Sequence, residues 1–440
     1  MTSYLLERAW VGGGVVDDVL VEIEDGRFTA VTPASGVEKS PRSTGETVTL
    51  RGLTIPGLAN CHSHAFHRAL RGRTQPNDGQ SRGTFWTWRE QMYGVAGRLD
   101  PDSYFALARA TFREMAAGGI TSVGEFHYLH HQPDGTPYDD PNAMGLALIA
   151  AADEAGIRIA LLDTCYLSSG FGRPPEGVQV RYSDGDAGRW ADRVSAIGHP
   201  HVGVAIHSVR AVPRDQLPTV VEAARGRPLH VHLSEQVAEN DACLATYGAT
   251  PTELLHDAGA LGPRTTAVHA THLTGADITH LGQSSTRACF CPTTERDLGD
   301  GIGPGRALAL AGATITLGSD SHAVIDLLEE MRALEMDERL ATQQRGHWTA
   351  AELLAAGTAH ESLGFDDAGT IAVGQRADLV TIDTTTPRTA GTGADEGTAV
   401  FAATAADVTH VVADGRVVAT RDDHEDIGRE LAAAIGRLHP

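Results

Sequence analysis

Histidine and carboxylate side chains follow several short apolar runs of this 440-residue chain. His62 and His64 lie two residues apart, so on an extended segment both imidazoles point the same way and can reach one ion. His232, His269 and Asp320 each come at or just after the end of a later apolar run. Nitrogen and carboxylate ligands around an open position suit zinc, although iron or manganese would also fit. These residue types predict a site for a divalent metal ion.

The elements that must position these residues are eight predicted strands with helical segments between most of them. Residues 104–117 and 142–155, for example, have helical patterns. The alternation is typical of repeated βα units and predicts a closed (β/α)8 barrel, an α/β fold in which working side chains lie at the carboxyl ends of the strands. A doubly wound open sheet stays possible from the pattern alone. The predicted strands are 53–58, 120–124, 157–163, 202–206, 229–232, 266–269, 288–291 and 314–317.

No single part of this pattern is specific. A His-x-His pair arises easily by chance in a chain with 21 histidines, and Asp320 alone would serve to cap a helix. A lone strand histidine is more often a hydrogen-bonded core residue than a ligand. The combination is harder to obtain by chance, because these residues follow strands one, five, six and eight in that order. The combination therefore favours a metal centre.

Both ends of the chain have β patterns. Asp25-Gly26 and Asp414-Gly415 each lie between alternating apolar residues, which is a strong hairpin signal, and residues 377–382 form another predicted strand. We predict a small β-sandwich module built from both termini. Residues 1–52 and 370–440 would form the two parts of this module, and residues 53–369 the metal-dependent barrel.

Composition argues against several classes of partner. The formal net charge of −22 is unfavourable for nucleic acid, because phosphate binding needs a basic face. The N-terminus has no basic segment followed by an apolar run, and no apolar stretch is long enough to cross a membrane. Five scattered cysteines fit free thiols in a reducing compartment. We expect a cytoplasmic protein that acts on a small molecule.

Three motifs lie at the first strand, at the eighth strand and in the C-terminal part. They are Pro56-Gly57-Leu58-Ala59-Asn60-Cys61-His62-Ser63-His64, Gly318-Ser319-Asp320 and Gly374-Gln375-Arg376-Ala377-Asp378-Leu379-Val380. Together they resemble the amidohydrolase superfamily, over essentially the whole chain. The resemblance implies that His62, His64, His232 and Asp320 are the metal ligands. It also implies that His269 lies beside the ion and contacts the substrate or the water.

The number of ions can be argued from the lysines. Lys39 is the only lysine of the chain and lies in the predicted β module, so the barrel has none to carboxylate as a bridge between two ions. Glu125, at the end of the second strand, is a candidate for a glutamate bridge instead. We predict one divalent ion per subunit, with zinc as the first choice.

Glu235 lies three residues after His232, and His-x-x-Glu at this position resembles the mononuclear deaminases of the superfamily. Alone, Glu235 would be interpreted as a carboxylate near a helix N-terminus. A divalent ion lowers the pKa of a water that it binds toward about 7, and Glu235 would take that proton and pass it to a leaving nitrogen. The predicted catalytic residues are Glu235, His269 and Asp320.

Four further sequence segments indicate a more specific resemblance than these motifs do. They are His64-Ala65-Phe66-His67-Arg68-Ala69, Phe85-Trp86-Thr87-Trp88-Arg89-Glu90, Gly124-Glu125-Phe126-His127-Tyr128-Leu129-His130-His131 and Ile206-His207-Ser208-Val209-Arg210-Ala211-Val212. They resemble the formimidoylglutamate deiminases, which hydrolyse N-formimino-L-glutamate to N-formyl-L-glutamate and ammonia in histidine degradation. The implied partner is a small dicarboxylate amidine.

An acidic protein needs guanidinium groups to hold two carboxylates, although most arginines are merely exposed charges. The resemblance implies that His207 and Arg210 bind a substrate carboxylate and that Tyr128 and Arg89 line the same pocket. His67 stands where many relatives have glutamine, so it either hydrogen-bonds the substrate or only packs.

Two other functions stay open. The same ligands and His-x-x-Glu would serve a mononuclear deaminase of guanine, cytosine, an adenosine derivative or a triazine. From another class, the chain could be a non-catalytic scaffold with an amidohydrolase-like fold, although every proposed ligand is present. The resemblance also makes a homodimer possible.

Overall fold

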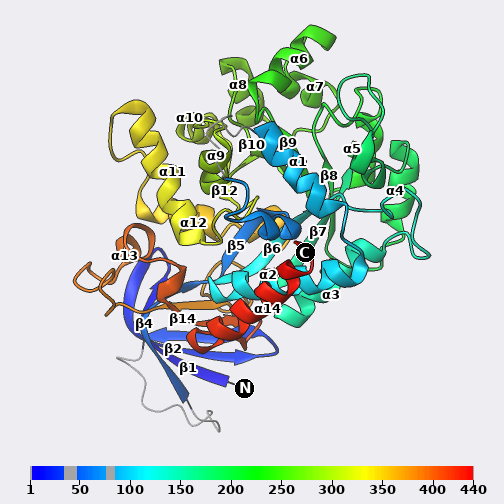
Figure 1. The fold of residues 1–440 in the computed structure, drawn as a ribbon. Helices are drawn as coiled ribbons and strands as arrows, with labels where there is room; N and C mark the ends of the chain where they lie inside the picture. The colour runs from blue at the N-terminus through cyan, green and yellow to red at the C-terminus, as the bar shows by residue number, and fades with distance from the viewer. Residues whose placement is uncertain (1, 34–46, 76–84, 440) are drawn as a thin grey trace.

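Two β-sheets organise the part of the chain that the computed structural model describes, residues 2–33, 47–75 and 85–439 (Figure 1). The larger sheet has eight strands in the order of the sequence, and all neighbours within it are parallel. The predicted α/β barrel fold is confirmed. Lys39 lies outside the described residues.

The barrel strands are short and almost wholly buried, as expected for parallel strands covered by helices on one side and filled by side chains on the other. They are β5 (Leu58–Ser63), β6 (Ile120–His127), β7 (Arg158–Cys165), β8 (Val202–Ile206), β9 (Leu229–Leu233), β10 (Thr265–His269), β11 (Arg287–Phe290) and β12 (Ile315–Leu317).

The barrel closes between its first and last strands through residues of the predicted metal site. Ser63 and Asp320 form a parallel bridge. The Asp320 N–H donates to the His62 carbonyl at 3.0 Å, and the His64 N–H donates to the Asp320 carbonyl at 3.2 Å. The backbone that closes the sheet therefore also carries the side chains of the candidate site.

Helices surround the barrel (Figure 1). Several helices begin with a capping box. In this motif the side chain of the first residue accepts the backbone N–H three residues later, and the side chain of that later residue accepts the first residue's N–H. Examples start at Asp100, Thr250, Thr274 and Thr349. The helices of the barrel region are α1 (Phe85–Ala96), α2 (Pro101–Ala117), α3 (Ala143–Ala155), α4 (Ala187–Ser195), α5 (Leu217–Ala224), α6 (Val237–Tyr247), α7 (Pro251–Asp257), α8 (Gly275–Gln283), α9 (Pro292–Leu298), α10 (Gly305–Ala311), α11 (Leu327–Thr342) and α12 (Ala350–Gly357). Short 3-10 helices are η2 (Ala65–Leu70), η3 (Gly177–Tyr182) and η4 (His360–Leu363).

The smaller sheet combines both ends of the chain, as predicted for the β-sandwich module. Its order is β15 (Arg416–Thr420), β14 (Val408–Ala413), β13 (Leu379–Ile382), β4 (Thr47–Pro56), β1 (Thr2–Val11), β2 (Gly14–Glu24) and β3 (Arg27–Pro33). The C-terminal part also contains α13 (Glu396–Phe401), η5 (Ala405–Asp407), η6 (Arg421–Asp423) and α14 (His424–Gly436). The division of the chain at residues 52 and 369 stays a prediction.

The two predicted hairpins meet at their tips. Asp25 and Gly26 have φ of 50° and 77°, and Asp414 and Gly415 have φ of 46° and 73°, as a type I′ turn requires. The Ala377 N–H donates to the Gly26 carbonyl at 2.8 Å, and the Gly415 N–H donates to the Ala377 carbonyl at 2.9 Å. The sheet therefore folds over, and side chains such as Leu6, Phe28 and Leu379 form a separate apolar core inside it.

One predicted strand is wrong in its extent. Residues 53–58 belong to two elements, because β4 of the small sheet ends at Pro56 and the first barrel strand begins at Leu58. Gly57 separates them, and a Cβ atom there would lie 2.3 Å from Thr121 Oγ1 and 2.8 Å from Asp378 Cβ. The chain changes sheets at a point where module and barrel approach too closely for a side chain.

Asp378, from the third sequence motif, joins the module to the barrel. Its side chain is buried and accepts hydrogen bonds from Arg158 of β7 and from Thr121 of β6, at 3.1 Å and 3.2 Å. A buried carboxylate needs such partners, because desolvation of an unpaired charge is costly. This motif therefore has a structural role.

The described helices include none that is both long and apolar enough to cross a membrane. All five cysteines are free thiols, as predicted; they are buried, and Cys61, Cys289 and Cys291 pack in one apolar cluster.

Candidate metal centre and active-site pocket

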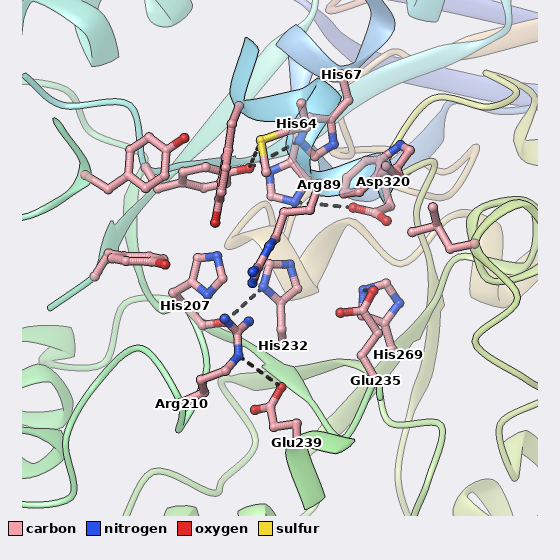
Figure 2. A pocket seen from close by; sticks show the side chains of 17 residues that line it. His64, His67, Arg89, His207, Arg210, His232, Glu235, Glu239, His269 and Asp320 are labelled. Atoms are coloured by element: carbon pink, nitrogen blue, oxygen red, sulfur yellow. Dashed lines mark hydrogen bonds and ion pairs between the residues drawn. The ribbon is translucent and has the colours of Figure 1, made fainter. Parts of the chain in front are cut away.

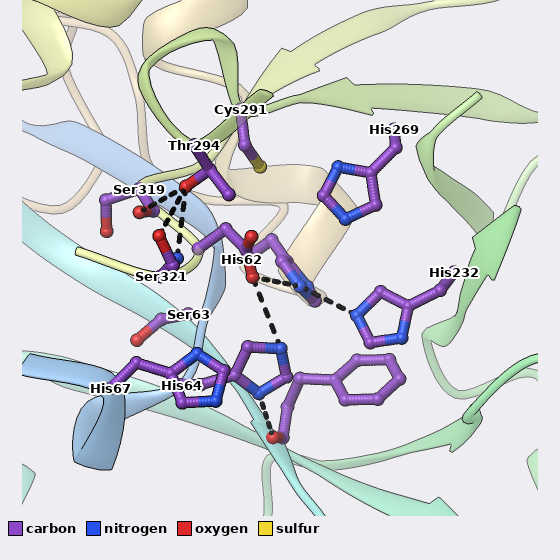
Figure 3. Close-up of polar contacts among 12 residues, drawn as sticks. His62, Ser63, His64, His67, His232, His269, Cys291, Thr294, Ser319 and Ser321 are labelled. Atoms are coloured by element: carbon purple, nitrogen blue, oxygen red, sulfur yellow. Dashed lines mark hydrogen bonds and ion pairs between the residues drawn. The ribbon is translucent and has the colours of Figure 1, made fainter. Parts of the chain in front are cut away.

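The candidate site lies at the carboxyl ends of the barrel strands, where the sequence predicts it. His62 and Ser63 are the last two residues of β5, and His64 follows them directly. His232 lies in β9, His269 is the last residue of β10, and Asp320 follows β12. Figure 3 shows the rings of His62, His64 and His232 turned toward one another, with His269 beside His62 and His232.

The nitrogen and oxygen atoms of this cluster are spaced as the corners of a metal site. The Asp320 Oδ1 atom lies 3.2 Å from His62 Nε2 and 3.3 Å from His64 Nε2, and His232 Nε2 lies 3.1 Å from His62 Nε2. In a tetrahedral zinc site with bonds of about 2.0–2.1 Å, neighbouring ligand atoms are about 3.3 Å apart. Three pairs of ligand atoms have this spacing. Atoms of His62, His232, His269 and Asp320 all lie within 4.8 Å of one another, as do those of His64, His67 and Asp320, so Asp320 is common to two groups that could hold a metal ion.

Hydrogen bonds on the outer nitrogens direct the inner nitrogens into the site. His64 Nδ1 lies 2.9 Å from the Phe126 carbonyl, and His232 Nδ1 lies 2.9 Å from the His207 carbonyl. Because a carbonyl only accepts, each Nδ1 carries the hydrogen and each Nε2 of the neutral ring keeps its lone pair. Burial lowers the pKa of His232 well below its usual range and that of His62 to about 3, so both rings are neutral.

Asp320 is the anionic member of the cluster. Burial opposes its ionisation, but the close contacts with His62 and His64 hold its pKa well below the usual range. The backbone at Asp320 is left-handed, with φ of 38°, as it is at Ser234 and His269, with φ of 51° and 67°. Such conformations cost about 1–3 kcal/mol each and persist where the surroundings impose them, typically at functional sites.

Glu235 and Glu295 flank His269 on two sides. His269 Nε2 lies 3.8 Å from Glu235 Oε1, and His269 Nδ1 lies 3.3 Å from Glu295 Oε1. Glu295 Oε1 also accepts the Cys291 N–H at 2.9 Å, which holds that carboxylate in place. Burial raises the pKa of Glu235 to about 7, a value suited to a group that takes up and releases a proton near neutral pH.

Glu125 does not join these groups. Its Oε2 accepts the Ser63 hydroxyl at 2.6 Å and its Oε1 accepts the Ala65 N–H at 2.6 Å. Burial raises its pKa to about 8. Among the described residues, the clusters with metal-ligand geometry do not include Glu125. Its oxygens fix the start of η2, which carries His67.

A pocket with a cavity volume of about 60 Å³ opens from this cluster (Figure 2). His64, His232, Glu235, His269 and Asp320 line one end of it. The predicted metal ligands and the predicted proton-transfer residue therefore face a cavity.

The predicted substrate-binding residues line the same pocket, namely His67, Arg89, Tyr128, His207, Arg210 and His269. Figure 2 shows the guanidinium groups of Arg89 and Arg210 on the side of the pocket near His207. The Arg210 Nε atom lies 3.8 Å from Glu239 Oε2, and the Arg89 guanidinium lies 5.5 Å from the centre of the Tyr93 ring. The pocket thus has a cationic part away from the histidine and aspartate cluster.

His67 packs and also hydrogen-bonds. Its Nε2 lies 3.2 Å from Tyr128 Oη. Its ring packs edge-to-face with Trp88, with the ring centroids 5.1 Å apart. Both His67 and Tyr128 are buried. The pair forms one wall of the pocket beside His64.

Several pocket residues were not predicted from the sequence. Tyr93, Tyr166, Tyr182 and Glu239 line the cavity, and Glu295 supports His269 from behind. Glu239 lies four residues after Glu235, in the first turn of α6, whereas Glu235 precedes that helix. The tyrosines come from α1, from the loop after β7 and from η3, and no spacing links them.

Comparison with known proteins agrees with this geometry. Residues 53–418 match the amidohydrolase family. The whole chain is 35% identical to a formimidoylglutamate deiminase of Pseudomonas aeruginosa, over the full length of both proteins. The chain belongs to the amidohydrolase family. It is accordingly a metal-dependent hydrolase.

Other relatives of this amidohydrolase are more distant. A 5-methylthioadenosine/S-adenosylhomocysteine deaminase of Natronomonas pharaonis is 27% identical, with 91% of this chain and 88% of the relative aligned. The crystal structure of an amidohydrolase from Brucella melitensis superposes with a TM-score of 0.88 at 30% identity, covering both chains completely. An adenosine deaminase from Xanthomonas campestris with bound zinc has a TM-score of 0.82 at 23% identity, over 99% and 98% of the two chains, and shares the fold.

Proposed function

We propose that this amidohydrolase is a formimidoylglutamate deiminase of histidine degradation, which hydrolyses N-formimino-L-glutamate to N-formyl-L-glutamate and ammonia. One observation carries the proposal: a single pocket is lined both by the metal-type cluster and by two arginines, Arg89 and Arg210. This arrangement suits a substrate with a reactive C–N group at one end and carboxylates at the other. The P. aeruginosa relative that bears this name aligns over the full chain.

The proposed reaction adds water across the C=N bond of the formimino group. The water oxygen becomes bonded to the formimino carbon, the bond from this carbon to the terminal nitrogen breaks, and that nitrogen leaves as ammonia with the hydrogens of the water. Glu235 takes a proton from the water and delivers it to the leaving nitrogen. Its raised pKa, about 7, suits both steps.

We propose that His62, His64, His232 and Asp320 hold one ion, and that the ion is zinc. The separations of 3.2 Å, 3.3 Å and 3.1 Å in the pairs His62–Asp320, His64–Asp320 and His232–His62 support this assignment, because ligand atoms of a tetrahedral zinc site are about 3.3 Å apart. The hydrogen bonds that Glu125 accepts on both oxygens argue against a glutamate bridge to a second ion. When bound, the ion supplies Lewis-acid activation of water and of the C=N group.

His269 and Asp320 orient the reacting groups in this proposal. Asp320 accepts a hydrogen bond from the attacking water, and His269, held by Glu295 on its outer nitrogen, donates to the substrate nitrogen or to the water. Arg210, His207, Arg89 and Tyr128 contact the carboxylate end of the substrate, with His67 supporting Tyr128.

The test is ammonia release from N-formimino-L-glutamate by zinc-loaded protein, beside guanine, cytosine and adenosine as rival substrates. Rapid release from the formimino compound alone supports the proposal. Turnover of a nucleobase or nucleoside instead would assign the chain to the other deaminases. Bound metal without turnover of any of these would favour a non-catalytic scaffold. Metal analysis of protein purified without added metal tests zinc and the ratio of one per chain.

A homodimer stays a prediction from the family resemblance, and a cytoplasmic location stays a prediction from the composition. Size-exclusion chromatography with light scattering tests the dimer, and cell fractionation tests the location.

A further inference from the structure

The pocket wall near Arg210 contains a buried glutamine between two tyrosines. Gln179 lies in η3 and its side chain is almost fully buried. The Gln179 Nε2 atom lies 2.8 Å from Tyr93 Oη and 2.9 Å from Tyr166 Oη. Tyr93 and Tyr166 both line the pocket, whereas Gln179 lies behind them.

The orientation of the Gln179 amide is set from the other side. The Glu176 N–H donates to Gln179 Oε1 at 3.1 Å, and a backbone N–H is only a donor. The Oε1 atom must therefore point to Glu176, and the NH₂ group must point to the two phenols. Because the NH₂ group has two hydrogens, it donates one to each phenol oxygen.

This orientation leaves the phenol hydrogens for another acceptor. The two hydroxyls contact each other, but that contact uses at most one of their two hydrogens. At least one of the two hydroxyl hydrogens is therefore left to bond to another acceptor. Tyr182 adds a second donor, because its buried Oη atom has no hydrogen-bond partner among the described residues. The wall thus presents donors, and its nearest charged neighbours include Arg89 and Arg210.

We propose that Gln179 is a specificity-determining residue that turns this tyrosine wall into a donor surface for a substrate carboxylate. The inference deepens the proposed function and rests on it for the identity of the substrate. A carboxylate accepts hydrogen bonds only, so it matches O–H groups and guanidinium N–H groups. The N–H edge of a nucleobase needs acceptors and matches this wall poorly. Gln179 would therefore favour a carboxylate substrate over the nucleobase substrates of related deaminases.

The sharpest variant is Gln179→Glu, which has the same shape. Its carboxylate still accepts the Glu176 N–H, but the oxygen that faces the phenols accepts their hydrogens instead of donating. The expected result is a rise of at least about tenfold in KM for N-formimino-L-glutamate, with kcat within about threefold, since hydrogen bonds to charged groups contribute about 1.5–3 kcal/mol. Tyr166→Phe and Tyr93→Phe, which add no charge, are expected to raise KM in the same direction by a smaller factor.

A carboxylate-free substrate separates specificity from general damage. N-Methylformamidine has the reacting group but no carboxylate, so its KM is expected to stay within about twofold in Gln179→Glu and Tyr166→Phe, because it makes none of the bonds at this wall. An equal rise in KM for both substrates, or an unchanged KM for N-formimino-L-glutamate, would overturn the inference. Unchanged metal content and melting temperature confirm that each variant is folded.

Binding of glutarate to the zinc-loaded protein tests the wall without catalysis. Calorimetry is expected to give an affinity at least about tenfold lower for Gln179→Glu and a smaller loss for Tyr166→Phe. Equal affinities, or no binding to the unsubstituted protein, would overturn the inference. If N-formimino-L-glutamate is not a substrate but glutarate binding depends on Gln179, the proposed function fails while the donor wall stands.

Discussion

The two ends of the active-site pocket are built in different ways. The metal-type end consists of side chains on strand ends, and its backbone is left-handed at Ser234, His269 and Asp320. The opposite end consists of side chains from α1, η3 and the loops after β7 and β8, including Tyr93, Arg89, Tyr166 and Arg210. It is held by side-chain contacts such as those of Gln179. Rigid strands thus position the chemistry, and loops and helices determine which molecule reaches it.

This comparison predicts that changes at the two ends have different kinetic signatures. Changes at the metal-type end should lower metal content or kcat, because they act on the reacting atoms. Changes at the cationic end should raise KM, because they act on parts of the substrate that do not react.

Asp320→Asn is expected to have the largest effect. Asparagine has the same size and tolerates the left-handed backbone, but it removes the charge of the oxygen that lies 3.2 and 3.3 Å from His62 and His64. We expect bound metal well below one ion per chain and no measurable ammonia release. Elemental analysis and the ammonia assay measure both. The exposed Asp215→Asn is the control, and full metal content with normal turnover in Asp320→Asn would contradict the ligand assignment.

Glu235→Gln is expected to lower kcat by about 10²–10⁴-fold while metal is retained, because general acid–base catalysis contributes about that factor. Glu239→Gln is the matched comparison, since Glu239 lines the same pocket and its Oε2 atom is 3.8 Å from Arg210. Its effect should fall mainly on KM. Steady-state kinetics of both variants give the answer, and near-normal kcat in Glu235→Gln would remove Glu235 from the reaction.

Arg210→Ala is expected to raise KM for N-formimino-L-glutamate by about 10–100-fold with a much smaller change in kcat, because it removes charge-assisted hydrogen bonds of about 1.5–3 kcal/mol. Arg210→Lys should recover part of the loss, because it keeps the charge without the planar fork. A fall in kcat at constant KM would place Arg210 at the reacting end instead, contrary to the comparison.

Tyr128→Phe is expected to have the smallest effect. It removes the 3.2 Å contact between Tyr128 Oη and His67 Nε2 and leaves the ring in place. Arg210, His207 and Arg89 still hold the carboxylate end of the substrate, so loss of this one hydroxyl corresponds to about a two- to tenfold change in kcat/KM. A decrease of more than about 100-fold would mean that the hydroxyl does more than position His67 or bind substrate.

The strand end of the site was predictable because period and order are local properties of the sequence. The predicted strand at 202–206 coincides with β8, and the others of the barrel, apart from 53–58, match within a few residues. The strand over 53–58 failed because Leu53, Ile55, Pro56 and Leu58 make residues 53–58 resemble one short apolar strand. Only the packing of Gly57 against Thr121 and Asp378 reveals the change of sheet.

The opposite wall was less predictable because its members meet only in the folded barrel. Gln179 is 86 residues from Tyr93 and 13 residues from Tyr166. In the sequence it lies in the segment Arg173-Pro174-Pro175-Glu176-Gly177-Val178-Gln179, which has the composition of a surface loop. Arg89 and Arg210 were recognised by resemblance, because nothing in their local sequence distinguishes a pocket arginine from an exposed one.

The bridge between Ser63 and Asp320 has a consequence for the order of events during synthesis. During synthesis, His62 and His64 leave the ribosome early. Until residue 320 has emerged, the cluster lacks the Asp320 carboxylate and the first barrel strand has not paired with the eighth. Ring closure and completion of the ligand set are therefore the same late event. An ion that binds only after the first and eighth strands have paired stabilises the closed barrel, so its binding free energy adds to the stability of that form.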